Sequence, residues 1–409
     1  GSGLVGSEMC IRDRYIPIGS LDTFIPLDTE GTSNSYIADR GAASYSFTAT
    51  IMGNGADGII DEGKFEDASG NILTKAGGAN IHPLSAKLLW QDTDELVEQV
   101  GLSDGKVQVK MGRSRGNALI AVYDKANPNA EDAKVLWSWH LWCTPVPQII
   151  ECATSIYTGN NYKVMDRNLG ATTSEPNLGT TQGLHYQFGR KDPFSGSLSY
   201  DGERTILYDV RSSTSILKAE IIDEAIQIRQ ALNFPDIYFL RHSDQEDWYE
   251  GVGAHYLWGN PEGRASVHPV KTTKTIYDPC PAGYKILPGD VFFVFARTTK
   301  PSEYSNEIIC KVENLNSLFY VKKIEDGGTT FYADGAGVDE TKLIYLPLAY
   351  SPQWAAGKLH SSGYYWTSSP RGDDLWYQGF TFYNQSGSTY WLNNGLPSWR
   401  LASVRCVKE

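Results

Sequence analysis

The side chains that most often perform catalysis occur in this chain, but their spacing matches no catalytic or metal-binding motif. No two histidines stand at the HxH or HExxH spacing of zinc ligands, and no GxSxG or P-loop sequence occurs. The carboxylates are so dispersed that none can be assigned to the acid and base pair of a glycosidase. We therefore expect a protein that is not an enzyme and that uses neither a metal nor another cofactor. The histidines are His82, His140, His185, His242, His255, His268 and His360.

One tripeptide suggests recognition of a protein. Arg371, Gly372 and Asp373 form the RGD sequence with which animal matrix proteins engage integrins, and the Ser-Pro before it predicts an exposed turn. Three common residues also coincide by chance in a chain of this length, so we favour an ordinary turn.

Two further segments suggest calcium. Glu175, Pro176 and Asn177 form the EPN sequence that calcium-dependent lectins use, but the nearest match to their WND sequence is WLNN at 391–394, which lacks the aspartate. The acidic segment GADGIIDEGKFED at 55–67 does not follow the twelve-residue EF-hand spacing. We expect a proline turn and a solvated acidic loop.

The aromatic residues of the last third offer the best candidate for a binding surface. In strands, alternate side chains face inward, so core packing accounts for many of these rings. The rings that face outward would form a platform for sugars, with amides beside it to donate hydrogen bonds. The candidate ring residues are Tyr390, Trp391 and Trp399, because they flank the Gly- and Asn-rich stretch NNGLPSW, which is typical of a loop, and Asn393 and Asn394 of that stretch would supply the hydrogen bonds.

Composition limits the kind of protein that could carry such a surface. The chain has 409 residues, 12% of them aromatic, and 40 glycines, which favours short strands joined by tight turns in two or three domains. Its formal net charge is −12 and no basic run is visible, which disfavours a nucleic-acid partner. No apolar run is long enough for a transmembrane segment.

The first region, residues 15–147, alternates apolar and polar residues at period two. In KVLWSWHLWC at 134–143, the side chains of Val135, Trp137 and Trp139 share one face, while Ser138 and His140 point the other way. SYSFTATI, KVQVKM and NALIAVYD repeat the pattern, separated by turn sequences. This predicts an antiparallel β-sandwich, followed by the proline-stiffened connector TPVPQ at 144–148.

The second region, residues 148–409, has a mixed pattern. ILKAEIIDEAIQIRQAL at 216–232 has the apolar spacing of a helix that stops before Pro235. PGDVFFVFAR at 288–297 suggests a second, short helix with Asp290 near its start, although VFFVF would also suit a strand. The last 70 residues are again strand-like, at 342–350, 363–369, 374–383, 388–392 and 402–407.

Five segments of the second region resemble a known family. VMDRNLGATT, GLHYQFGRKDPF, TIYDPCPAGYKI, GYYWTSSP and SVRCVKE are similar, in order and spacing, to the Fibrobacter succinogenes major paralogous domain of Bacteroidota surface proteins. That family is similar in fold to C-type-lectin-like domains, with two helices packed on twisted sheets. The first region resembles the β-sandwich that precedes this domain in fimbrillin-like proteins. The expected fold is therefore mainly β, with an α+β C-terminal part: a sandwich at 15–147 and a C-type-lectin-like domain at 148–409.

The resemblance implies an exported, extracellular protein of the cell surface. It suggests a non-enzymatic adhesin or fimbrial tip subunit that binds a glycan or a host or bacterial surface protein. The alternatives are a structural fimbrial subunit, whose partners are other fimbrial subunits, and a surface glycan-binding protein of a polysaccharide-uptake system.

The cysteines would bear on export, because disulfides form in oxidising compartments. Without Cys10, five remain, and two bridges can be chosen among them in fifteen ways. The resemblance favours Cys280–Cys406, and Cys143–Cys152 is plausible across a short loop, which leaves Cys310 over. The alternative is that all five are reduced and pack as small apolar residues.

The first fourteen residues are expected to be an artefactual leader. LVGSEMCIRD at 4–13 matches the conceptual translation of a transposase sequencing adapter, which suggests a truncated gene of metagenomic origin. This interpretation removes Cys10 from the disulfide count and accounts for the lack of a signal peptide or lipid anchor. We expect residues 1–14 to contribute nothing to the core.

Overall fold

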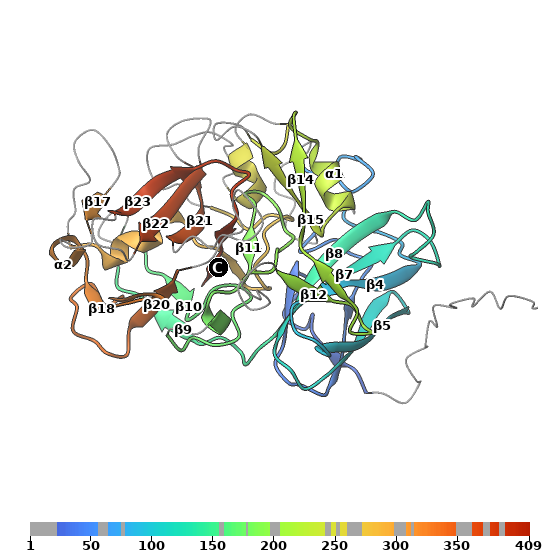
Figure 1. The fold of residues 1–409 in the computed structure, drawn as a ribbon, viewed down its shortest axis with the longest axis horizontal. Coiled ribbons are helices and arrows are strands. Elements are labelled where there is room, and N and C mark those ends of the chain that lie inside the picture. The colour runs from blue at the N-terminus through green and yellow to red at the C-terminus, as the bar shows by residue number, and fades with distance from the viewer. Residues whose placement is uncertain are drawn as a thin grey trace, which may run out of the picture.

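The computed structural model shows a mainly β protein, as the sequence predicts (Figure 1). Residues 1–14 lie outside the part of the chain that the structure describes, so the expectation for the leader stays a prediction. No helix in the described ranges is long and apolar enough to cross a membrane. The structure describes residues 23–55, 64–74, 78–154, 159–176, 179–196, 205–241, 247–250, 254–259, 272–297, 308–311, 315–348, 362–370, 377–383 and 389–409.

The first region forms two packed sheets. One has the order β1-β3-β6-β5, made of Ile25–Pro26, Ser44–Thr48, Lys106–Met111 and Val97–Ser103. The other has the order β13-β12-β4-β7-β8-β2, made of Thr214–Ile216, Ile206–Tyr208, Ser85–Gln91, Gly116–Tyr123, Val135–Cys143 and Ser35–Ala38. The pairs β1–β3 and β2–β8 are parallel and the other pairs are antiparallel, so the predicted antiparallel sandwich has parallel edge strands.

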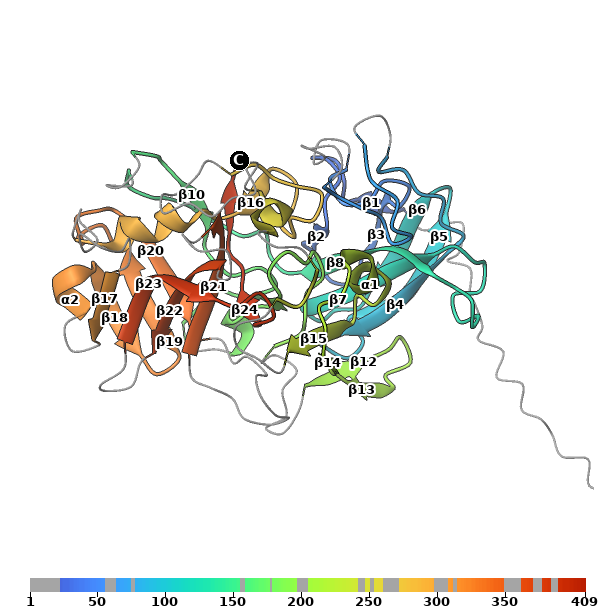
Figure 2. The same cartoon turned by 90° about the horizontal axis from the view of Figure 1, so that it is seen from above.

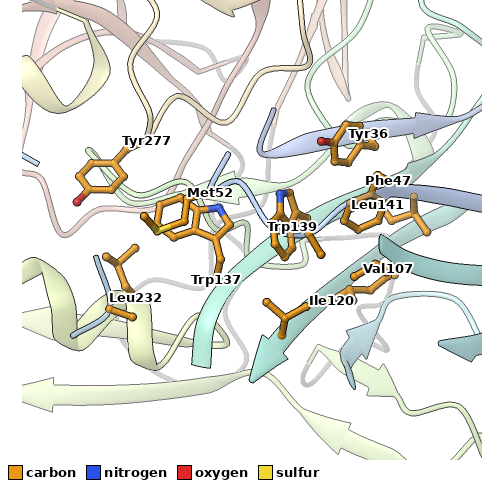
Figure 3. Packing of buried hydrophobic residues seen from close by; sticks show 14 of the residues in the cluster. Tyr36, Phe47, Met52, Val107, Ile120, Trp137, Trp139, Leu141, Leu232 and Tyr277 are labelled. Atoms are coloured by element: carbon orange, nitrogen blue, oxygen red, sulfur yellow. The ribbon is translucent and has the colours of Figure 1, made fainter. Parts of the chain in front are cut away.

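The period-two pattern fills the space between these sheets (Figure 3). Phe47 of β3 and Trp139 of β8 are buried with ring centroids 5.4 Å apart, and Val107 of β6 is fully buried in the same cluster. The alternation predicted for β3, β6 and β8 is therefore confirmed. The opposite face of β8 is buried as well, since Ser138 and His140 are each only 1% exposed.

The second region covers that opposite face. Trp90, Leu119 and Trp142 of the six-stranded sheet pack in one cluster with residues from 165–188, 258 and 280–286. The hairpin β12–β13 extends the same sheet, with Tyr208 opposite Gln91. In Figure 3, Tyr277 and Leu232 of the second region lie beside Trp137. The boundary predicted near residue 147 stays a prediction, but the two regions share their cores.

The rest of the second region contains four sheets. The first two have the orders β16-β25-β10-β9 and β11-β24-β21-β22-β23-β17, from Tyr284–Ile286, Cys406–Lys408, Lys163–Met165, Ile149–Glu151, His185–Tyr186, Ala402–Ser403, Ser362–Pro370, Tyr377–Tyr383, Thr389–Leu396 and Ile308–Lys311. The others are β18-β19-β20 and β14-β15, from Val321–Glu325, Gly328–Tyr332, Leu343–Pro347, Lys218–Ile222 and Ile237–Arg241. The strands predicted in the last 70 residues are all present.

The helix predicted over 216–232 is wrong in its first half. Lys218–Ile222 instead forms β14, which pairs in parallel with β15, and only α1 (Ile228–Asn233) is helical. The β-branched pair Ile221–Ile222 suits a strand, and pairing with residues nineteen positions later in the chain overrides the local helical spacing. The helix does end before Pro235, as predicted.

The second predicted helix is confirmed as η4, a 3-10 helix over Gly289–Phe295 with Asp290 in its first turn. Every residue of η4 is buried, and Phe292 stacks on Phe380 at 4.8 Å between ring centroids. The remaining helices in the described ranges are short: α2 (Leu315–Leu318), η1 (Gly179–Thr181) and η3 (Ala254–Trp258).

Candidate functional site

The disulfide predicted between Cys280 and Cys406 is present, with the Cα atoms 6.0 Å apart. Polar groups hold the turn around it. The Asp278 carboxylate accepts hydrogen bonds from the backbone N–H groups of Cys280 at 2.8 Å and Ile286 at 3.0 Å. Lys274, fully buried, donates to the carbonyls of Cys280 and Pro281 at 2.7 and 2.8 Å. The side chains of Lys274 and Asp278 therefore fix the conformation of the turn that carries Cys280.

The predicted bridge between Cys143 and Cys152 is wrong, because both are free and buried. Cys143 ends β8 in the sandwich core, and its thiol donates to the carbonyl of Ser114 at 3.3 Å. Cys152 packs in a different cluster, around η4. Burial raises the pKa of Cys143 to about 11 and that of Cys152 to about 12, so neither thiol is reactive. The side chain of Cys310 lies outside the described residues.

Three of the motifs meet in a buried hydrogen-bond network of Asn168, Tyr365 and Arg405. Arg405 donates from Nε and Nη2 to Asn168 Oδ1 at 3.0 and 2.7 Å, and from Nη2 to the carbonyl of Tyr345 at 2.8 Å. Asn168 Nδ2 donates to the Tyr365 hydroxyl at 3.2 Å, which donates to the carbonyl of Pro347 at 2.8 Å. All of these side chains are buried. Asn168, Tyr365 and Arg405, which come from three of the motifs, are thus held together in the interior.

Lys191 and Ser138 form an arrangement that resembles a catalytic pair. Lys191 Nζ lies 2.6 Å from Ser138 Oγ and 2.5 Å from Asp192 Oδ1, and burial lowers the pKa of this lysine to about 8. The adjoining cavity, however, holds only about 10 Å³, the space of one water molecule. No substrate can reach Ser138 through it, so the pair joins β8 to the second region.

Arg190 positions the short helix α1. Its guanidinium donates to the carbonyls of Ala231 at 3.3 Å, Phe234 at 3.1 Å and Ile237 at 2.6 Å, which lie in α1, just after it, and at the start of β15. It also lies 4.9 Å from the centroid of the Phe194 ring. A cation at the C-terminal end of a helix satisfies carbonyls that have no partner within the helix. This places the N-terminal end of α1 at the interface between the first and second regions, where the backbone N–H of Arg229 meets Glu66.

A groove of about 230 Å³ lies at this interface, and it is the best candidate for a ligand site among the described residues. One side comes from residues 64–72 of the sandwich region. The other comes from the start of α1, from residues 249–250 and from η3. The lining residues are Lys64, Phe65, Glu66, Ile72, Gln227, Ile228, Arg229, Tyr249, Glu250, Tyr256 and Leu257.

Hydrogen bonds fix the floor of the groove. Glu66 Oε1 accepts the backbone N–H of Arg229 at 2.8 Å, and the backbone N–H of Glu66 donates to the Tyr277 hydroxyl at 2.9 Å. Lys64 Nζ lies 5.5 Å from the centroid of the Tyr256 ring, where a cation is attracted to the ring face. Burial raises the pKa of Tyr256, and the charge of Glu66 adds to this shift. The side chains of Arg229 and Glu250 are exposed at the rim.

The groove combines chemistry that suits a polar, ring-shaped ligand. Carboxylates, an ammonium, a guanidinium and the Gln227 amide supply donors and acceptors, while the half-buried Tyr256 supplies apolar ring surface. Its volume is below the roughly 300–1,000 Å³ of drug-sized pockets, so it admits one sugar ring or one to two side chains.

The ligand site predicted from the sequence is not supported where it can be examined. Trp399 is 2% exposed and packs in the sandwich core, so its ring has no free face. Tyr390, Trp391, Asn393 and Asn394 belong to strand β23, not to a loop, and their side chains lie outside the described residues. The Gly and Asn content of 393–399 predicts a loop, but residues 394–396 pair with β22, and the residues before them, 389–392, pair with β17. The loop prediction holds only for 397–399, after β23 ends.

The other candidate motifs add no site. Glu175 and Pro176 are exposed and Pro176 lies in a turn, which agrees with the proline-turn prediction, while Asn177 and the RGD residues 371–373 fall outside the described residues. Of the acidic segment at 55–67, only residues 64–67 and Gly55 are described. Within the described ranges no group of three or more His, Cys, Asp or Glu residues is placed to hold a metal ion.

Sequence reasoning missed the groove because its lining comes from separate segments. Nothing in the sequence near Glu66 indicates that it meets Arg229, 163 positions later. No protein-family model, no curated protein and no solved structure matches this chain.

Proposed function

We propose that this chain is a non-enzymatic binding protein of the cell surface, an adhesin or fimbrial tip subunit, that recognises a glycan or a protein. The observation that carries the proposal is the groove between the two regions, with its mixture of charged, amide and aromatic side chains. Such a lining orients a ligand through a few polar contacts and holds it against ring surface. The disulfide Cys280–Cys406 supports export, because such bonds persist in oxidising compartments.

The test is a glycan and matrix-protein array, run with calcium and with a chelator. The wild-type chain is compared with Tyr256→Ala in the groove and with Trp391→Ala in β23. We expect a specific hit that Tyr256→Ala weakens by roughly tenfold or more, as for loss of an aromatic contact of 1–2 kcal/mol.

Tyr332→Ala is the matched control. Tyr332 also lies beneath a lysine, with Lys322 Nζ 5.7 Å from its ring centroid, but it is remote from the groove. Loss of binding in both tyrosine variants would indicate a general effect on the fold. Loss in Trp391→Ala alone would move the site to β23, and a hit that the chelator abolishes would add a calcium ion to it.

The second candidate is a structural fimbrial subunit whose partners are only other subunits. No hit on either array, together with growth of long, open-ended assemblies in solution, would favour it. A hit confined to polysaccharides would favour a surface glycan-binding protein of an uptake system.

A further inference from the structure

Strand β14 has an open edge and carries apolar residues on its surface. It pairs on one side with β15, and no other strand of the described chain lies against its outer edge. Four consecutive residues, 218–221, are exposed, so both faces of the strand meet solvent. Ile221 is 60% exposed and Ile216, just before the strand, is 50% exposed. Exposed strand edges are templates for pairing with another chain.

The surroundings of β14 concentrate this apolar surface. Four of the nine large, exposed hydrophobic residues in the described chain fall between residues 210 and 234, and these are Val210, Ile216, Ile221 and Phe234. Figure 2 shows β12, β13, β14 and β15 together at one rim of the molecule. The edge is therefore accessible to a partner.

Hydrogen bonding limits how a second copy could pair with this edge. In a parallel pair such as β14–β15, alternate residues of β14 direct their N–H and C=O groups toward β15, and the others direct them outward. Two copies related by a two-fold axis must therefore place residues of the same parity opposite each other. The extended stretch that contains β14 begins before Lys218, since β13 ends at Ile216, so its middle lies at residues 218–220. The axis then passes through Lys218, Ala219 or Glu220.

Charge selects one of these three registers. An axis at Lys218 or at Glu220 would set two like charges directly opposite each other, which is destabilising. An axis at Ala219 sets Lys218 opposite Glu220 of the second copy, twice. Lys218 already contacts Asp236 of its own chain at 2.8 Å, and its ammonium has further N–H groups for a second carboxylate.

The apolar residues agree with the same register. An axis at Ala219 sets Leu217 opposite the exposed Ile221 of the second copy, twice. Cross-strand pairs of apolar side chains contribute to the stability of antiparallel sheets. We propose that two copies of this chain associate through antiparallel pairing of β14 with β14, about a two-fold axis at Ala219. The dimer then contains a continuous four-stranded sheet, β15-β14-β14-β15, and presents two binding grooves.

A charge exchange tests the register. Sedimentation velocity over a concentration series measures dimerisation, and we expect the wild-type chain to form dimers. In Glu220→Lys, the new lysine of each copy would lie opposite Lys218 of the other copy, so the dissociation constant should rise roughly tenfold or more. The double variant Lys218→Glu with Glu220→Lys restores opposite charges and should recover dimerisation. Asp132→Lys, with the same change of charge on the distant turn before β8, should leave the dimer unchanged. A wild-type chain that is monomeric at its highest soluble concentration overturns the proposal.

A cysteine at the axis gives an independent measurement. Only a residue on the two-fold axis lies opposite itself, so Ala219→Cys should form a covalent dimer on mild oxidation. Glu220→Cys is the control, because it would lie opposite Lys218 and should cross-link far less. Equal cross-linking of both variants, or none in either, contradicts the register. These experiments do not depend on ligand binding, so they remain informative if the proposed function fails.

Discussion

Removing the disulfide Cys280–Cys406 should destabilise the fold, because the unfolded chain would regain conformational freedom. Cys280 and Cys406 are 126 positions apart, and closing a loop of that length in the unfolded chain removes about 5 kcal/mol of conformational freedom at 25 °C in the chain-entropy model. In the folded chain, the bonds of Asp278 and Lys274 hold the turn around Cys280 independently of the bridge. We therefore expect the double variant Cys280→Ala, Cys406→Ala to fold and to lose about 3–5 kcal/mol of unfolding free energy.

Urea unfolding followed by tryptophan fluorescence measures this loss. The m-value should rise, because an unfolded chain without the cross-link exposes more surface. Cys152→Ala is the control, since it removes a buried free thiol and closes no loop. A loss below about 1 kcal/mol with an unchanged m-value would refute the reasoning, because the bridge would then not restrict the unfolded chain.

Three other changes test the buried polar groups and the core. Lys191→Met leaves a buried carboxylate without its cation and should lower the unfolding free energy by about 3–5 kcal/mol, measured in urea. Burial lowers the pKa of His140 to about 3 and that of His185 to about 4, so their contribution to stability is present above about pH 6.5 and is lost as the pH falls. The pKa of Asp92, raised by burial to about 6, acts in the opposite direction, and the two histidines outweigh it. Unfolding free energy should therefore fall by about 2–4 kcal/mol between about pH 7 and about pH 4, and a constant or rising value would contradict this. Trp399→Ala should cost about 3–5 kcal/mol as a core residue and, in calorimetry at a temperature where it stays folded, leave ligand affinity unchanged.

The sequence was informative where one local pattern decided the structure. Alternation in β3, β6 and β8 identified the residues between the sandwich sheets, because strand geometry alone sends alternate side chains to opposite faces. The same reasoning could not show that Ser138 and His140 are buried. Their cover comes from the second region, and their partners include Asp192, whose carboxylate lies 2.6 Å from Ser138 Oγ.

The errors have a common physical cause in pairing between distant segments. Lys218–Ile222 has a helical apolar spacing, yet it forms a strand because it pairs in parallel with β15. Trp399 follows a stretch rich in residues typical of loops, yet its ring is buried in the sandwich core. Glu66 and Arg229 meet in the groove because tertiary contacts position α1, among them the bonds of Arg190 and the bond from Asn233 to the carbonyl of Ala68. None of these partners is specified by the residues next to each segment.

The six-stranded sheet of the sandwich has a consequence for the order in which the chain can fold during synthesis. Its strands β2 to β8 are synthesised before the hairpin β12–β13 that completes it, which ends at residue 216. The side chains of Trp90 and Trp142 are buried later still, because the residues that pack with them include Trp258 and Cys406. Domains usually fold in turn as they leave the ribosome. Here β4 and β8 keep large aromatic rings uncovered until the segments that carry Trp258 and Cys406 have been synthesised, and exposed apolar surface favours aggregation in that interval.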